Sequence, residues 1–214
     1  MADNYLEKRY EEVFGNGSCK TVRKVVNPSL DSLLLRNRSH RSFSHSQMVS
    51  PDAIRAIIGV NSRIASARNQ QVLRFRALSD EMQTAAVTKM IRLGASLPDE
   101  KLPPEGAEPP VYIVVCSCAG ENRWVDIDLG LSLEAMSLKA VELGLNATIV
   151  GSFDREALCS LLEISDLEPL ALLAVGKGLD KIQLLSIKED ESRAYYRKEG
   201  IHYVPKLSTD ELLF

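Results

Sequence analysis

Three arginines and two serines lie in one short segment, residues 36–43, which reads Arg-Asn-Arg-Ser-His-Arg-Ser-Phe. The segment directly follows an apolar, helix-like run from Leu30 to Leu35. Guanidinium groups packed together repel one another unless an anion compensates them, and their forked donors suit a phosphate. A small phosphorylated ligand is therefore one interpretation of Arg36, Arg38 and Arg41. The other is a solvated basic helix end, where arginine complements the negative pole of the helix dipole.

A second polar segment favours the ligand. Residues 66–71 read Ser-Ala-Arg-Asn-Gln-Gln and are rich in hydroxyl and amide groups. They lead directly into residues 72–78, whose side chains alternate in the manner of a β-strand. Hydrogen-bonding groups next to a strand are thus available to a bound molecule.

Together the two segments resemble those of the nitroreductase superfamily of flavin mononucleotide (FMN) enzymes. That family carries Arg-Arg-Ser-x-Arg-x-Phe and later Pro-Ser-x-x-Asn-x-Gln-Pro-Trp-x-Phe. The matching residues here are Arg38, Ser39, Arg41 and Phe43 in the first motif, and Ser66, Asn69, Gln71 and Phe75 in the second. The departures are Asn37 for the first arginine, Ala65 for proline, and Val72-Leu73 for Pro-Trp.

Later segments keep the family's order, so that the resemblance covers roughly residues 28–178. Residues 109–116 resemble its apolar strand, and residues 128–145 resemble its central helix. Residues 148–153 resemble the loop over the flavin, and residues 174–177 resemble the last core strand and its turn.

The resemblance implies a site for FMN at the interface of a homodimer. Arg38, Ser39 and Arg41 are expected to hold the phosphate and ribityl end, while Asn37 weakens one contact for which Arg36 could substitute. Backbone groups at residues 150–152 are expected to face the isoalloxazine edge, and Ser66 and Asn69 are expected to approach the same flavin from the other subunit. The expected cofactor-binding residues are Arg36, Asn37, Arg38, Ser39, Arg41, Ser66, Ala67, Arg68, Asn69, Gln71, Val150, Gly151, Ser152 and Lys177.

The length of 214 residues, with 45% hydrophobic and 26% charged residues, fits one globular domain spanning residues 1–214. Helices and short strands alternate without a Gly-x-Gly-x-x-Gly turn, so we expect an α+β sandwich rather than a Rossmann fold. In it a mixed or antiparallel central sheet is flanked by helices, as in nitroreductases. The C-terminal extension, residues 179–214, resembles tails that embrace a partner subunit, and a self-packed extra strand is the alternative.

Helix signals are clear at several points. Helices are expected after Ser29, from Ser50-Pro51, over residues 80–93, over residues 128–143 and from Asp154 to Leu162. Residues 97–110 contain five prolines and predict a loop or flap. Residues 169–175 predict a short buried strand.

The helix over residues 128–143 has two apolar faces, one of which contains Leu133 and Met136 and the other Leu131 and Leu138. Such a helix is covered on most sides. A core position and a subunit interface both explain it.

Several classes are disfavoured. A formal net charge of -3 argues against a nucleic-acid partner. Residues 1–12 are polar, and no apolar run approaches the roughly 20 residues that span a bilayer, so no membrane association and a cytoplasmic location are expected. The three histidines show no metal-ligand spacing, and no metal is expected.

The resemblance therefore implies an FMN-dependent oxidoreductase that uses NADH or NADPH as electron donor. The acceptor is expected to be a small molecule such as a nitroaromatic or a quinone. Two alternatives remain open: a protein that binds or sequesters flavin without turnover, and a flavin-free interaction protein on the same fold. No acid-base pair or nucleophile is visible, and hydride transfer requires none.

Overall fold

The computed structural model describes residues 28–97 and 99–214. The polar segment over residues 1–12, on which the expected cytoplasmic location partly rests, therefore lies outside the described residues.

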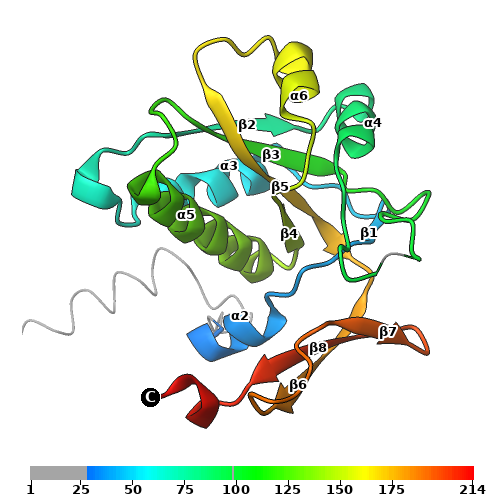
Figure 1. Cartoon of the computed structure of the whole chain (residues 1–214). Helices are drawn as coiled ribbons and strands as arrows, with labels where there is room; N and C mark the ends of the chain where they lie inside the picture. The colour runs from blue at the N-terminus through cyan, green and yellow to red at the C-terminus, as the bar shows by residue number, and fades with distance from the viewer. Residues whose placement is uncertain (1–27, 98) are drawn as a thin grey trace, which may run out of the picture.

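The centre of the fold is an antiparallel sheet of five strands (Figure 1). Its strands are β1 (Phe43–Ser44), β2 (Leu73–Leu78), β3 (Val111–Ser117), β4 (Asn146–Val150) and β5 (Glu168–Gly178). The longest, β5, pairs antiparallel with β3, β4 and β1, and β3 pairs antiparallel with β2. Of the two sheet types expected from the sequence, the antiparallel one is correct.

Helices cover both faces of this sheet, as the sandwich predicted. In Figure 1, α3 (Pro51–Ile58) and α5 (Arg123–Glu142) lie on one face, and α4 (Glu81–Met90) and α6 (Arg155–Leu162) on the other. A shorter helix, α2 (Leu30–Arg36), lies beside α5. The helices and the sheet together bury two hydrophobic clusters, one on each face.

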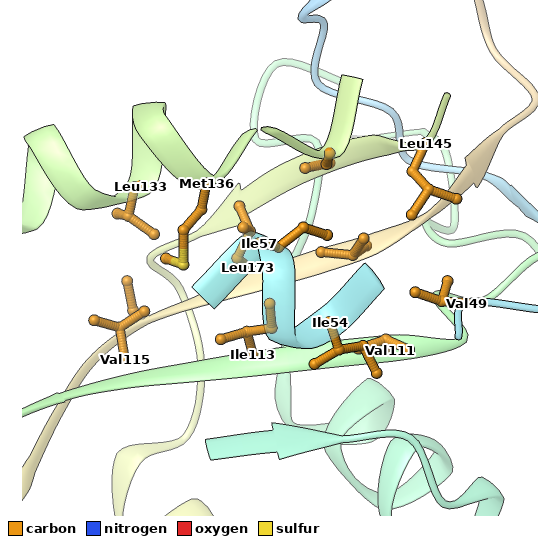
Figure 2. Packing of buried hydrophobic residues seen from close by; sticks show 14 residues of the cluster. Val49, Ile54, Ile57, Val111, Ile113, Val115, Leu133, Met136, Leu145 and Leu173 are labelled. Atoms are coloured by element: carbon orange, nitrogen blue, oxygen red, sulfur yellow. The ribbon is translucent and has the colours of Figure 1, made fainter. Parts of the chain in front are cut away.

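The sequence of β3 is almost entirely apolar because every residue of this strand is buried. Ile113 and its register partner Leu173 on β5 are both fully buried and face α3 and α5. Figure 2 shows them packed with Ile57 of α3 and Met136 of α5. Tyr112, next to Ile113, points to the opposite face, toward α4 and α6, as the alternation of a strand requires.

The polar caps identified in the sequence start the helices. Ser29, Ser50 and Asp154 accept hydrogen bonds from backbone N–H groups in the first turns of α2, α3 and α6. The start of α5 differs from expectation, because Asn122 caps it and the helix begins at Arg123 instead of residue 128. The end of α4 differs as well, since it stops at Met90.

The C-terminal extension forms a second sheet within the chain. β6 (Lys181–Ile187) pairs parallel with β8 (Ile201–Leu207), and β7 (Tyr196–Lys198) pairs antiparallel with β8. A short 3-10 turn, η3 (Asp210–Leu212), follows. In Figure 1 this C-terminal sheet lies below the central sheet, next to α2. These three strands pair with one another within the chain, whereas the sequence offered a single self-packed strand or a tail that embraces a partner subunit.

Candidate functional site

The arginine-rich segment forms a turn between α2 and β1, which we call the basic turn (residues 37–42). The turn is fixed to the central sheet, because Ser39 forms a parallel bridge with Ala147 of β4. The backbone N–H of His40 donates to the carbonyl of the same alanine at 3.4 Å. Phe43, fully buried, then enters β1 and pairs with Gly178 at the end of β5.

A pocket of about 400 Å³ opens beside the basic turn. The turn forms one wall, and α5 and β4 form the next. The third wall is the C-terminal sheet with the segment that precedes β7. The lining residues are Asn37, Arg38, Ser39, Arg41, Glu134, Ser137, Ala147, Ile149, Ile182, Tyr195, His202, Val204 and Lys206.

Arg38 is half-buried in this pocket and only partly paired. One guanidinium nitrogen, Nη2, donates to the carbonyl of Leu34 at 2.6 Å, at the end of α2. Its Nε is buried and has no hydrogen-bond partner within the described part of the chain. Burial lowers the pKa of Arg38, and the nearby Glu134 carboxylate opposes this. The remaining donors of the guanidinium are available to an anion.

Arg41 is held by the C-terminal sheet. Its guanidinium lies over the ring of Tyr195, 4.7 Å from the centroid, and donates to the carbonyl of Ser39. Its Nη1 is also 3.2 Å from Nε2 of His202. Since arginine has no acceptor, Nε2 must be the acceptor and the neutral ring carries its proton on Nδ1. Burial, with the charges of Arg41 and Arg197, lowers the pKa of His202 to about 4, which keeps this ring neutral at pH 7.

Asp180, at the start of the C-terminal extension, joins the turn to the C-terminal sheet. Its carboxylate is only 6% exposed and accepts the backbone N–H groups of Arg41 and Ser42 at 2.7 and 3.0 Å. Arg197 of β7 donates to its other oxygen at 2.7 Å. Burial alone would raise the pKa of Asp180, but the His40 ring, these two N–H groups and the Arg197 charge together hold it well below its usual range.

Gly178 allows this close packing of the chain. A Cβ at Gly178 would lie 2.1 Å from Nδ1 of His40, which is buried under the strand. Any side chain at residue 178 would therefore clash with the His40 ring, and only glycine lets the end of β5 lie against the basic turn.

Asn37 stands where an arginine was expected, and its side chain binds a carboxylate. Its Nδ2 donates to Oε1 of Glu134 on α5 at 2.9 Å. Glu134 lines the pocket, so it adds a negative charge close to the arginines. Arg36 does not substitute for the missing cation in this structure, because it points back along α2 and donates to the carbonyl of Ser32.

The second predicted segment lies elsewhere in the chain. Ser66 and Gln71 line a separate pocket of about 210 Å³, formed with β2 and α5. The segment is fixed to α5, because the buried carboxylate of Asp128 accepts the backbone N–H of Ala67 at 2.7 Å. The non-glycine residues with left-handed backbones here are Arg68, Asn69 and Gln71, with φ of 52°, 54° and 49°. The structure thus does not bring the two motifs together within one chain.

The remaining predicted residues lie at two other places. Val150 is buried at the end of β4, while Gly151 and Ser152 are exposed just beyond it. A Cβ on Gly151 would meet nothing within 4 Å, so the space over this loop is open. Lys177 does not line the pocket, because its Nζ donates to the carbonyl of Gly144 at the end of α5.

The pocket residues that were not predicted from the sequence are Glu134, Ser137, Ala147, Ile149, Ile182, Tyr195, His202, Val204 and Lys206. Most belong to the C-terminal extension, which the family motifs do not reach. The sequence did contain one signal for them. His202, Val204 and Lys206 are spaced two residues apart, and alternate residues of a strand lie on one face, so the three could have been expected to face the same site.

Metal ligation and membrane insertion are two further possibilities for residues 28–97 and 99–214. There, no group of three or more His, Cys, Asp or Glu residues could hold a metal ion. Among the same residues, no helix is long and apolar enough to cross a membrane.

Comparison with known proteins identifies the fold. Residues 34–177 match the sequence model of the Nitroreductase family. No characterised, curated protein is similar enough in sequence to match this chain. The match ends at Lys177, so the C-terminal sheet lies outside it.

Among solved structures, a nitroreductase family protein from Streptococcus pneumoniae TIGR4 is 17% identical with a TM-score of 0.59, covering 72% of this chain and 93% of that chain. A nitroreductase family protein from Clostridium novyi NT is 18% identical with a TM-score of 0.60, covering 72% and 87%. The FMN and NADPH-dependent nitroreductase NfnB from Sphigopyxis sp. strain HMH is 16% identical with a TM-score of 0.57, covering 71% and 89%. At these identities the likeness is one of fold.

The link through Asp180 predicts a pH-dependent loss of stability. Asp180→Asn should lower the free energy of unfolding at pH 7 by about 1–3 kcal/mol, because charge-assisted hydrogen bonds are lost in a buried position. The lowered pKa of Asp180 means that the stabilisation is present above its ordinary value of 3.8 and is lost as the pH falls below it. Urea unfolding should therefore show a difference from wild type that is largest at neutral pH and shrinks in acid. Asp190→Asn, at an exposed position in the same extension, is the control; an equal effect of both substitutions would contradict the prediction.

Proposed function

The chain belongs to the nitroreductase family, and on that premise we propose that it is an FMN-dependent oxidoreductase. Membership of the family supports an oxidoreductase. The relative NfnB is described as FMN and NADPH-dependent, which supports the same cofactor and a nicotinamide donor here. The proposed acceptor is a small molecule such as a nitroaromatic or a quinone.

The observation that carries the proposal is the donor set of the pocket beside the basic turn. Arg38, Ser39 and Arg41 line it together with Lys206 of β8. The buried, unpartnered Nε of Arg38 is a donor that an anion would satisfy, and leaving such a donor unpaired costs about 1–3 kcal/mol. These groups fit the phosphate end of FMN.

The apolar side of the pocket suits a ring system. Ile149 of β4, although 48% exposed to solvent, lines the pocket with Ile182 and Val204. Just beyond Ile149, the backbone of Gly151 faces open space. We infer that N–H groups of residues 150–152 orient the flavin ring from its edge.

When bound, FMN would supply the redox chemistry, accepting a hydride from NADH or NADPH and passing electrons to the acceptor. The residues of the chain would then bind and orient it. Arg38 and Arg41 would hold the phosphate, and the neutral His202 would keep Arg41 in place by accepting from Nη1.

A homodimer is part of the proposal. The helix α5 exposes Trp124, Ile127 and Leu131, which are 54%, 42% and 46% exposed and share one helix face. Leu30 and Leu35 of the neighbouring α2 are 62% and 67% exposed. Adjacent exposed apolar side chains of this kind are typical of an interaction surface, and a symmetric dimer is the commonest arrangement that buries one. A dimer would also let residues 66–71 reach the pocket of the other subunit.

A second candidate is a protein that binds flavin without turnover. It is favoured by the C-terminal sheet, which forms one wall of the pocket, and by the Asn37–Glu134 pair, which replaces a cation by a carboxylate. A flavin-free interaction protein is the third possibility. Binding and reduction experiments separate the three.

Anaerobic reduction tests the oxidoreductase itself. The protein loaded with FMN should lose the visible absorbance of oxidised flavin when NADH or NADPH is added without oxygen, and regain it when a quinone is supplied. Bound FMN that stays oxidised would instead support the sequestering protein. Failure to bind FMN at all would support the flavin-free alternative.

The phosphate assignment predicts a selective effect of Arg38. Arg38→Ala should weaken FMN binding by roughly 10- to 100-fold, because one charge-assisted contact is lost. Arg36→Ala is the matched control, since Arg36 lies two residues earlier and outside the pocket. Quenching of FMN fluorescence measures both affinities, and circular dichroism checks the fold. Equal affinities for the two variants would mean that the turn is only a solvated helix end.

The dimer predicts a concentration-dependent assembly through α5. Sedimentation should give about twice the chain mass of 23.7 kDa, and Leu131→Asp should dissociate the dimer because it puts a charge into the apolar contact. Met82→Asp, at an 83% exposed position on α4, should leave it intact. A wild-type monomer that binds FMN tightly would refute the shared site.

A further inference from the structure

A pocket of about 700 Å³ lies between α4 and the proline-rich loop that precedes β3. One wall is a face of α4, and the other is formed by the loop from Lys101 to Pro110. We call this pocket the α4 groove. It shares no lining residue with the pocket beside the basic turn, so the two sites are separate.

The α4 wall is a single helix face that is polar instead of apolar. Its members have the spacing of one side of a helix over more than two turns, and they are Glu81, Thr84, Ala85, Thr88 and Lys89. At a rise of 1.5 Å per residue, the first and last of them lie about 12 Å apart along the helix axis. The α4 groove is therefore elongated, with a carboxylate at one end of its helical wall and an ammonium group at the other.

The loop adds a second positive charge at the Lys89 end. Lys101 precedes Leu102, whose Cδ1 would lie 2.6 Å from a Cβ on Gly94, just after the end of α4. The loop therefore returns to the C-terminal end of the helix at this point. Lys101 and Lys89 thus line the same end of the groove.

The four outermost charges of the groove have no internal partner. Glu108 is already occupied, because it accepts the backbone N–H of Gly106 at 3.1 Å and lies 3.8 Å from Nε2 of His45. Over residues 28–97 and 99–214, the lining residues that form no salt bridge are Glu81, Glu105, Lys89 and Lys101. Both signs of charge are thus free to meet a ligand.

The threonines on the helix face offer acceptors to the groove. Thr84 Oγ1 donates to the carbonyl of Glu81 at 3.1 Å, and Thr88 Oγ1 donates to the carbonyl of Thr84 at 2.8 Å. The hydroxyl of Tyr112 is 2.9 Å from Thr88 Oγ1 and must be the donor of that pair, because a threonine has only one hydroxyl proton. Burial raises the pKa of Tyr112 to about 12, so the phenol keeps this proton at neutral pH. A ligand that supplies N–H donors would therefore suit this wall.

The facing wall is apolar. Leu102, Pro103 and Pro109 line it, and both of these prolines are buried. Proline has no backbone N–H, so the loop presents hydrocarbon and few donors at these positions. The groove thus combines an apolar wall, a row of acceptors and opposite charges at its two ends.

We propose that the α4 groove binds a short peptide that has apolar side chains and free ends. The peptide N–H groups donate to the threonine hydroxyls, and the apolar side chains pack on the loop. The peptide ammonium lies at Glu81 and Glu105, and its carboxylate lies at Lys89 and Lys101. An extended chain rises about 3.3 Å per residue, so a length of about 12 Å corresponds to three or four residues. Binding involves no covalent or redox step and does not depend on FMN.

Calorimetric titration of the full chain with trileucine tests the proposal, and blocked forms of the same peptide test each end. Trileucine with free ends should bind saturably. The N-acetylated form and the C-terminal amide should each bind roughly threefold to tenfold more weakly, because contacts between exposed charges contribute modestly. Trileucine blocked at both ends should bind most weakly.

Two double variants identify the residues at each end. Lys89→Met combined with Lys101→Met should weaken binding of free trileucine but not of its amide, which has no carboxylate to lose. Glu81→Gln combined with Glu105→Gln should weaken binding of free trileucine but not of the N-acetylated form. These four residues are exposed, so the fold should persist, and circular dichroism checks it.

Matched controls lie outside the groove. Lys198→Met removes an exposed lysine of β7, and Glu156→Gln removes the exposed acid in the first turn of α6, as Glu81 is in α4. Neither should change the affinity for trileucine.

The outcomes are distinct. Weaker binding that depends on the matching free end in both double variants supports the proposal. No saturable binding of trileucine at millimolar concentration overturns it, and so do equal affinities for free and blocked forms or an effect at one end only. An overturned proposal leaves the oxidoreductase standing, because the variants change no residue of the pocket beside the basic turn.

Discussion

The carboxylate of Asp180 connects the parts of this molecule that form the pocket. It accepts two backbone N–H groups of the basic turn and pairs with Arg197, which also binds Glu100 of the proline-rich loop at 2.7 Å. A charge that is 6% exposed is stable only when its hydrogen bonds are all made, so these partners constrain one another. The turn, the C-terminal sheet and the loop are therefore fixed in one arrangement, and the pocket lies where the first two meet.

The pocket that results is lined by two kinds of side chain. Arg38, Arg41 and Lys206 supply positive charge, and Ile149, Ile182 and Val204 supply an apolar wall. This combination suits a molecule with an anionic tail and a flat apolar ring, as in a flavin nucleotide. The arginines therefore form a local excess of positive charge in a chain whose net charge is -3.

Much of the fold was predictable, because local rules determine it. Polar caps such as Ser50 and Asp154 mark helix starts, and the continuous apolar run of β3 marks a strand buried on both faces. The start of α5 was misplaced because Asn122 was not recognised as its cap. The extension was only partly predictable. Its aromatic content indicated packing, but the parallel pairing of β6 with β8 depends on contacts between residues some 20 positions apart.

The site was predictable to the extent that its motif is contiguous. The motif lies within residues 38–41, and its members Arg38, Ser39 and Arg41 all line the pocket. Long-range contacts determined the rest. Neither the pairing of Asn37 with Glu134, 97 positions away, nor the approach of His202 to Arg41, 161 positions away, leaves a local signal in the sequence. The position of Lys177 outside the pocket also depends on a distant partner, because its Nζ donates to the Gly144 carbonyl just after α5.

We propose that a flavin nucleotide binds between the basic turn and the C-terminal sheet. A crystal structure of the full chain with FMN is the decisive measurement. Density for the phosphate is expected within hydrogen-bonding distance of the Arg38 and Arg41 guanidiniums, at about 2.7–3.2 Å. Density for FMN at another place on the chain, or a phosphate that contacts neither guanidinium, would refute the proposal.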